Sequence, residues 1–229
     1  VCSAQDALAE IKSDHFDSNY EMLKGITNSD ERYYRLEGYL FPDTYDFYKN
    51  EEPQQAIQKL VSNCNKKLTK EIRQKIEDKG MTIDQALTLA SLVQAEAANE
   101  DDMYVVSSVF QNRLNSDPSQ GLFYLNSDPT IFYPYKNGTV PEDVKDTFSS
   151  TYNTYKVKGL PPGPICNPGK AAIEAALYPD EELIKDNYLY FCLGDPATGE
   201  TLFQRTAEEH EAAKAKWSPV WEEYQNSMN

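Results

Sequence analysis

The stretch TIDQALTLASLVQAEAANEDDMYVVSSVFQNRLNS, residues 82–116, predicts the two central helices of the fold. Thr82 with Gln85 three residues later forms a capping box, a common start of a helix. Apolar residues then recur at helical spacing and form one stripe: Ala86, Leu89 and Val93. The pattern therefore predicts an amphipathic helix that begins at residue 82.

Glu96 occupies the next position on this stripe, because successive residues of a helix are ~100° apart. Leu92 and Val93 lie one turn before it and alanines flank it, and such surroundings disfavour a charged carboxylate and raise its pKa. A carboxylic acid of this kind is suited to general acid catalysis. Gln94 is ~200° away around the helix and has no titratable proton. A solvated residue at a helix end is the plainer interpretation of Glu96.

A second amphipathic helix follows directly. Asn99 is a typical N-cap, and apolar residues recur after it at helical spacing: Met103, Val106, Phe110 and Leu114. Glu96 would therefore lie at the junction of two helices, which is a suitable place for a cleft.

The composition of the 229 residues is that of a globular protein, with 40% hydrophobic and 26% charged residues. A formal net charge of −15 argues against a nucleic-acid partner and gives no support for contact with an anionic membrane, whereas a glycan is compatible. The sequence lacks an apolar run of the ~18 residues that a membrane span needs. Because it opens on Val1, it has the look of an excised fragment, which leaves location open.

The sequence offers no pattern for a metal or cofactor. Its cysteines form no Cys-x-x-Cys pair and occur at Cys2, Cys64, Cys166 and Cys192. Their even number permits two disulfides without requiring them. The histidines, His15 and His210, lie outside any recognisable catalytic motif. We therefore expect neither a cofactor nor a Cys-His or Ser-His nucleophile.

The secondary-structure pattern of the N-terminal third is less clear. Residues 1–31 show a weak helical pattern, and the aromatic-rich segment 33–48 begins like a strand. Glu37 within it has the pattern of an exposed strand residue. Pro53 opens one long helix, which runs through residue 79 and ends at Gly80.

The middle of the chain is poor in periodicity. Segment 121–133 mixes a short strand with an Asp-Pro turn, and 134–150 reads as a loop. Segment 151–169 is so rich in Pro and Gly that we expect a long, rigid loop, which is often functional in a compact domain. Asn167 would then cap a helix that ends at Tyr178.

The C-terminal part predicts a β-hairpin followed by a helix. Segments 187–193 and 201–204 alternate like antiparallel strands, and Thr206 with Glu209 caps the last helix. The whole chain therefore predicts an α+β fold of helices packed with short antiparallel strands.

Seven segments together resemble the YceG-like family of endolytic murein transglycosylases. They span residues 35–216 in the family's order: LEGYLFPDTYDF, LASLVQAEA, VFQNRL, SDPT, YNTY, GLPPGPICNPG and LYFCL. Each segment alone is weak, but seven in order with plausible gaps are highly specific.

The resemblance implies a YceG-like catalytic domain over residues 32–229 and places residues 1–31 at the end of a small LysM-like lobe. The resemblance also implies a membrane-anchored protein that acts on the outer face of the bacterial cytoplasmic membrane. They cut nascent peptidoglycan glycan strands, and their setting implies cell-wall synthesis proteins as further partners.

The resemblance also implies site residues. The family's catalytic Glu lies in the segment that matches LVQAEA, where many relatives have two acidic residues. Gln94 stands at the first of these positions, which leaves Glu96 as the catalytic residue. The remaining motifs imply substrate-binding residues: Glu37, Asn112, Ser127, Asp128, Thr130, Tyr152, Asn153 and Thr154. Relatives often have Gln-Thr-Asp-Pro-Thr where this chain has residues 126–130, so we expect altered detail there.

Three functional hypotheses follow. The first is a lytic transglycosylase in which Glu96 alone acts as acid and then base and leaves 1,6-anhydro-muramic acid ends. The second is a hydrolase that uses water and two carboxylates, with Asp128 or Glu37 as the partner of Glu96. The third is a glycan-binding module that does not cut.

Overall fold

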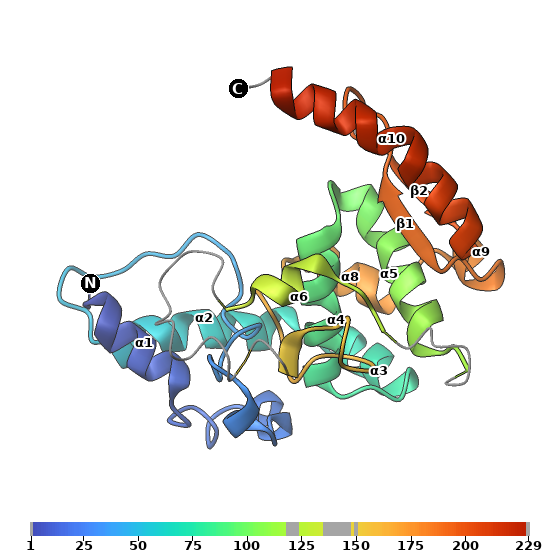
Figure 1. The fold of residues 1–229 in the computed structure, drawn as a ribbon. Coiled ribbons are helices and arrows are strands. Elements are labelled where there is room, and N and C mark those ends of the chain that lie inside the picture. The colour runs from blue at the N-terminus through green and yellow to red at the C-terminus, as the bar shows by residue number, and fades with distance from the viewer. Residues whose placement is uncertain (1, 118–123, 135–147, 149–150, 228–229) are drawn as a thin grey trace.

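A computed structural model describes residues 2–117, 124–134, 148 and 151–227. Helix α4 (Ile83–Glu96) lies at the centre of a helical body, packed against α5 (Glu100–Leu114) and α8 (Lys170–Leu177). The C-terminal strands and the last helix form an arm on one side of this body (Figure 1). Helices combined with one small antiparallel sheet confirm the predicted α+β class.

The two central helices begin where the sequence predicts. Thr82 accepts a hydrogen bond from the Gln85 N–H at 3.1 Å, and the Gln85 side chain accepts one from the Thr82 N–H at 2.9 Å. Asn99 caps α5 by accepting from the Asp102 N–H at 3.0 Å. Local capping chemistry therefore places both helix starts and the junction that holds Glu96.

Helix α4 is buried on more sides than a single stripe. Residues Ala86 through Val93 are all buried, because α5, α8 and the loop after residue 160 surround the helix. Its buried hydroxyls bond within the helix, with Thr88 Oγ1 donating to the Asp84 carbonyl at 2.7 Å. A helix covered all round is a core element, which explains why it can hold a side chain at its end in a fixed place.

The N-terminal 31 residues share the core of the rest. They form α1 (Ala4–Lys12) and the 3₁₀ turns η1 (Glu21–Gly25) and η2 (Ser29–Glu31). Their buried side chains belong to the same hydrophobic cluster as α4: Phe16, Met22, Leu23 and Ile26. The division of the chain at residue 31, and its link to a LysM-like lobe, stay predictions.

The aromatic segment 33–48 contains no strand, so that expectation was wrong. The N–H groups of Gly38 and Leu40 donate to the side-chain oxygen of Asn167, at 2.8 and 3.0 Å. The Asn167 side chain thus accepts the backbone hydrogen bonds that the carbonyls of a neighbouring strand would accept in a sheet. Periodicity within residues 33–48 cannot reveal such a partner.

The single helix expected over 53–79 is two helices, α2 (Pro53–Lys67) and α3 (Lys70–Asp78). Thr69 interrupts it because its side chain accepts from the Ile72 N–H at 3.3 Å and starts a new helix. The apolar spacing of four residues continues across the break, so the sequence pattern hides it.

Two further boundaries differ from the prediction. The Asp-Pro pair opens a short helix, α6 (Asp128–Phe132), where a turn was expected. Helix α8 begins at Lys170, three residues after Asn167, whose side chain is engaged with segment 37–40. Residues 121–123 of the segment in which a short strand was expected, and most of the expected loop 134–150, lie outside the described residues.

The C-terminal arm agrees with the prediction. After the short helix α9 (Glu181–Lys185), β1 (Tyr190–Leu193) pairs antiparallel with β2 (Thr201–Gln204), with Phe191 opposite Phe203. Thr206 and Glu209 form the capping interactions of α10 (Ala207–Ser227), at 3.2 Å in each direction.

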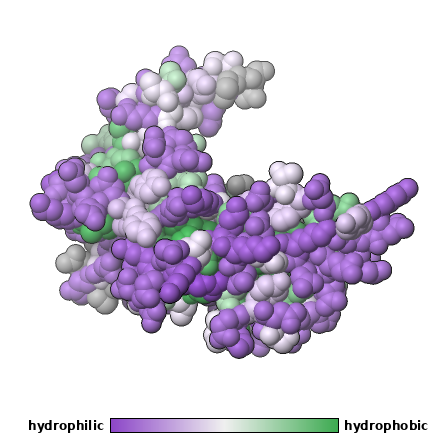
Figure 2. Space-filling model, turned by 180° about the vertical axis from the view of Figure 1, so that it is seen from behind, coloured by the Kyte–Doolittle hydropathy of each residue, from purple (hydrophilic) through white to green (hydrophobic). Residues whose placement is uncertain are grey.

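The face in Figure 2 is mostly hydrophilic, with small hydrophobic areas between polar ones. Among the described residues, no helix has the length and apolar character that would let it cross a bilayer.

Candidate active site

Glu96 is the last residue of α4, and its side chain is half-buried. The helix stops there because Ala97 adopts an extended conformation, with φ −71° and ψ 137°. The chain then turns through residues 97–99 into α5. The position combines a rigid, buried helix behind the carboxyl group with an open junction in front of it.

Tyr155 lies near Glu96 and pairs with Asp128. The Tyr155 hydroxyl donates to Asp128 Oδ1 at 2.6 Å. Partial burial, this hydrogen bond to Asp128 and the nearby charge of Glu96 together raise the pKa of Tyr155 to about 12. The three side chains therefore form one electrostatic group, which we call the acidic triad: Glu96, Asp128 and Tyr155.

The sequence prediction missed Tyr155, although the YNTY segment contains it. Tyr155 is 46% exposed and follows three residues that were predicted as site residues. Its contact with Asp128 crosses 27 positions of the chain. The sequence signal for Tyr155 was its position as the aromatic residue that ends the YNTY segment, directly after three predicted site residues.

The predicted residues Ser127, Thr130 and Thr154 form the buried support of the acidic triad. Thr130 Oγ1 lies 2.9 Å from Thr154 Oγ1 and donates to the Ser127 carbonyl at 2.6 Å. The Ser127 N–H donates to Thr154 Oγ1 at 2.9 Å, whereas the buried Ser127 hydroxyl has no hydrogen-bond partner within the part of the chain that the structure describes. These contacts tie α6, which carries Asp128, to the segment that carries Tyr155.

Two other predicted residues lie apart from the acidic triad. Asn153 caps its own turn, accepting from the Tyr155 N–H at 3.0 Å. Asn112 is buried on α5, and its amide donates to the carbonyls of Leu183 and Tyr188, both at 2.9 Å. The structure thus uses Asn112 to join α5 to the C-terminal arm.

Glu37 is not the exposed strand residue that its local pattern indicates. It is half-buried, and Asn167 Nδ2 donates to its Oε1 at 2.8 Å. Burial raises the pKa of Glu37 to about 7. Glu37 therefore has surroundings of the kind that the sequence pattern assigned to Glu96, and its local pattern did not predict them.

Two buried tyrosines lie close to Glu37. The rings of Tyr133 and Tyr152 are 4.6 Å apart between centroids, and both residues are buried. Among the described residues, neither hydroxyl has a hydrogen-bond partner. Burial raises the pKa of both hydroxyls, and the charge of Glu37 raises them further. Tyr152, a predicted site residue, thus belongs to the surroundings of Glu37.

The loop of residues 160–169 connects the Glu37 region to α4. The Ile165 N–H donates to Ser91 Oγ at 3.0 Å, and the Gly169 N–H donates to Gln94 Oε1 at 3.2 Å. Asn167, between them, binds Glu37. Gln94 is therefore engaged by the loop, whereas the charge of Glu96 acts on Tyr155.

No group of three or more Cys, His, Asp and Glu side chains within the described ranges is arranged to hold a metal ion. Within the described residues, none of the cysteines forms a disulfide: Cys2, Cys64, Cys166 and Cys192.

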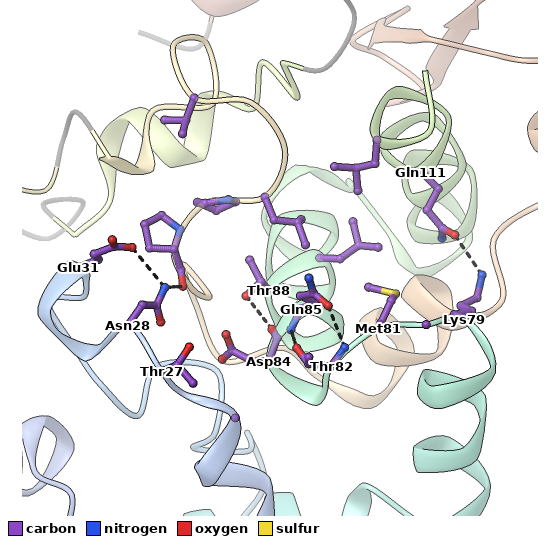
Figure 3. A pocket seen from close by; sticks show the side chains of 18 of the residues that line it. Thr27, Asn28, Glu31, Lys79, Met81, Thr82, Asp84, Gln85, Thr88 and Gln111 are labelled. Atoms are coloured by element: carbon purple, nitrogen blue, oxygen red, sulfur yellow. Dashed lines mark hydrogen bonds between the residues drawn. The ribbon is translucent and has the colours of Figure 1, made fainter. Parts of the chain in front are cut away.

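A large cavity lies at the other end of α4. It has a volume of about 820 Å³ and is lined around Lys79–Leu89, Asn28 and Pro162, without Glu96 or Asp128 (Figure 3). We assign the candidate active site to the acidic triad, because that is where acid–base groups converge.

The fold and the site define an α+β protein whose buried central helix ends in a carboxylate beside a Tyr–Asp pair. The profile of the YceG-like family matches residues 2–216, and the chain belongs to this family.

Known relatives agree with this assignment. The chain is 36% identical over 185 residues to a Bacillus subtilis protein named endolytic murein transglycosylase, covering 80% of this chain and 48% of that protein. A Streptococcus pneumoniae protein of the same name is 35% identical over 184 residues, which cover 78% of this chain and 31% of that protein. The chain thus spans about half and about a third of the length of these relatives.

A solved structure is also similar. The crystal structure of a yceG-like protein from Listeria monocytogenes has a TM-score of 0.73 and 32% sequence identity, covering 92% of this chain and 67% of that chain. The shared fold therefore extends over nearly the whole chain.

Proposed function

We propose that this chain is the catalytic region of a lytic transglycosylase that cuts peptidoglycan glycan strands. The observation that carries the proposal is the half-buried Glu96 at the end of α4, next to the Tyr155–Asp128 pair. The names of the curated relatives support the substrate class.

In the proposed reaction, Glu96 gives its proton to the glycosidic oxygen between N-acetylmuramic acid and the next N-acetylglucosamine. The bond from C1 to that oxygen breaks, and the Glu96 carboxylate then takes the proton of the muramic 6-hydroxyl while this oxygen attacks C1. The product is a 1,6-anhydro ring, and no water is consumed. The attack is intramolecular, which gives it an advantage in effective concentration over water.

Asp128 and Tyr155 complete the proposed site. The hydrogen bond from the Tyr155 hydroxyl fixes the Asp128 carboxylate in place. A fixed negative charge near C1 stabilises the positive charge that develops there as the glycosidic bond breaks. Asp128 is exposed and sits at the start of α6, so a sugar can reach it.

A two-carboxylate hydrolase is the second candidate, because Glu37 has a pKa of about 7. In this alternative Glu37 or Asp128 would assist a water molecule at C1. We favour the transglycosylase because Glu37 is engaged by Asn167 and lies among the buried Tyr133 and Tyr152.

The test is product analysis with purified sacculi and the variant Glu96→Gln. We expect the wild-type chain to release fragments with 1,6-anhydro ends, one water lighter than hydrolysis products. Glu96→Gln keeps the size of the side chain but has no transferable proton, so turnover should fall by about 10³-fold or more with folding unchanged. Glu100→Gln, on the exposed first turn of α5, is the matched control and should retain activity.

Two results would redirect the proposal. Fragments that carry the added water, together with inactivity of Glu37→Gln or Asp128→Asn, would favour the hydrolase. Binding to sacculi without any cleavage would favour a glycan-binding module.

We also propose that the chain acts outside the cytoplasmic membrane, as part of a membrane-anchored protein working beside cell-wall synthesis proteins. This follows from the substrate class, since nascent glycan strands are assembled there. Fluorescent fusions of the full-length protein would test the location.

A further inference from the structure

The cavity at the start of α4 is a feature that the proposed reaction does not use. Its volume of about 820 Å³ is within the usual range for ligand pockets, ~300–1,000 Å³. It is formed where four parts of the chain meet, around Thr27, Lys79, Gln111 and Pro161 (Figure 3). Helix α4 has 14 residues, so this end lies about 20 Å from Glu96.

Lys79 supplies a positive charge at one side of this cavity. Its ammonium group donates to Gln111 Oε1 at 3.1 Å, and within the described part of the chain it forms no ion pair with a carboxylate. Partial burial and the nearby Lys75 lower the pKa of Lys79. A half-buried cation without a counter-ion, in a chain of net charge −15, marks a place for an anionic group.

Gln111 is held so that it can keep Lys79 in place. Its Nε2 donates to Ser107 Oγ at 3.0 Å and to the Ala176 carbonyl at 3.1 Å, which leaves its oxygen facing Lys79. Figure 3 shows Lys79 and Gln111 on one side of the cavity and Glu31 on the opposite side.

The acidic groups of the cavity differ in availability. Asp84 is occupied by the buried guanidinium of Arg32 and by the Tyr39 hydroxyl, at 2.9 and 2.8 Å. Glu31 is exposed and has a single long contact, 3.5 Å from Asn28 Nδ2. The cavity therefore presents a free-facing carboxylate at one side and an ammonium group at the other.

The lining has no aromatic side chain. Between the charged ends it offers amides, hydroxyls and aliphatic groups, among them Met81, Leu114 and Pro162. Sugar rings usually stack on aromatic faces, so this lining does not suit a glycan. It suits a short peptide with a carboxylate, an ammonium group and small aliphatic side chains.

We propose that this cavity binds the peptide stem of peptidoglycan, with a stem carboxylate at Lys79 and a stem ammonium group toward Glu31. This inference rests on the proposed function, since it names a second part of the same substrate. The cavity would then hold a peptide of the strand while the acidic triad acts on the glycan, about one helix length away.

The test uses an N-acetylated stem tetrapeptide, with isoglutamine second, lysine third and a free C-terminal carboxylate, and its C-terminal amide. Both are titrated into the chain by NMR. We expect the free acid to shift signals of Lys79, Gln111 and Thr82, and the amide to bind about tenfold more weakly. Lys79→Gln should weaken binding of the free-acid peptide by about tenfold, whereas Lys79→Arg should retain binding. Lys70→Gln, exposed on α3, is the matched control.

Equal binding of acid and amide, or no effect of Lys79→Gln, would overturn the proposal. So would shifts confined to Glu96 and Asp128. If Lys79→Gln fails to fold, Val157→Trp fills the cavity from another wall and should abolish binding. Cleavage of peptide-free glycan strands reports the proposed function separately, because that substrate has no stem.

Discussion

The carboxyl groups of the site differ because of their surroundings and not because of their residue type. Asp128 is exposed and accepts a hydrogen bond from Tyr155, whereas Glu37 is half-buried and has a pKa of about 7. The burial of Glu37 favours a neutral acid near physiological pH. Sequence spacing identified Glu96 as a candidate, but it could not rank Glu37, whose burial depends on a loop some 130 residues away.

At the same scale, Tyr155→Phe tests whether Tyr155 positions Asp128. The substitution removes the 2.6 Å hydrogen bond to Asp128 and leaves the ring. We expect kcat on sacculi to fall by about 10- to 100-fold, because a mobile carboxylate stabilises developing charge less well. The unfolding midpoint should hardly change, since Tyr155 is 46% exposed.

Tyr178→Phe is the control for this variant. Tyr178 is 49% exposed and lies against Lys75, away from the acidic triad. Full activity of Tyr155→Phe would show that Asp128 needs no such support.

Glu37→Gln tests the raised pKa of Glu37. Because the folded pKa is about 7 and the ordinary value 4.5, ionisation of Glu37 costs stability as pH rises from 4.5 to 7. Gln mimics the neutral acid and can still accept from Asn167. We expect the variant to match wild type near pH 4 and to exceed its unfolding free energy by up to about 3 kcal/mol near pH 8.

The measurement is urea unfolding of both proteins across this pH range. The difference between them isolates Glu37 from the many other carboxylates of the chain. A difference that is flat with pH would mean that Glu37 titrates at its ordinary value in the fold.

At the scale of elements, the sequence predicted what local chemistry determines. The capping pairs at Thr82 and Thr206 placed the starts of α4 and α10, and alternation placed β1 and β2. The errors over 33–48 and at the start of α8 share one cause, the long-range contact of Asn167 with Gly38 and Glu37. Asp128 was predicted for the site, whereas Tyr155 depended on the packing of two distant segments.

Gly38→Ala tests the fit of segment 36–41 against the loop of residues 160–169. A Cβ at Gly38 would lie 2.3 Å from Pro164 Cγ, and φ is +88°. Since backbone strain and the clash add, we expect a loss of about 2–4 kcal/mol in unfolding free energy. Thermal or urea denaturation measures it.

Gly159→Ala is the matched control. Its φ is +79°, but a Cβ there would meet nothing within 4 Å. The unfolding free energy of this variant should fall by only about 1 kcal/mol, the cost of the backbone strain. If the two variants are equally stable, the loop moves at Pro164 to admit the new Cβ and does not hold the segment that carries Glu37 in place.

For the whole molecule, α5 joins the helical body to the C-terminal arm. Arg113 donates to the carbonyls of Leu189, at the start of the arm, and of Tyr124 and Leu125, just before α6, at 2.6, 2.9 and 3.0 Å. One buried guanidinium thus links the arm to the segment that leads to Asp128. The connection suggests that the arm and the acidic triad are coupled through α5.

Asn112→Ala tests this connection without touching the acidic triad. The Asn112 amide donates to the Leu183 and Tyr188 carbonyls, both at 2.9 Å. The Leu183 carbonyl also accepts from the Tyr188 N–H at 3.1 Å, so the substitution removes the side-chain donor of the Tyr188 carbonyl and one of two donors of Leu183. We expect the unfolding free energy to fall by about 1–3 kcal/mol, because an unpaired buried polar group costs ~1–3 kcal/mol. Hydrogen exchange should speed up in β1 and β2 more than in α4, whereas kcat on sacculi should change less than in Tyr155→Phe.

Asn115→Ala, exposed at the end of α5, is the control, and its unfolding free energy should stay within about 0.5 kcal/mol of wild type. Unchanged exchange in the arm, or a loss of kcat as large as that of Tyr155→Phe, would mean that Asn112 serves the substrate directly, as the family motif implies.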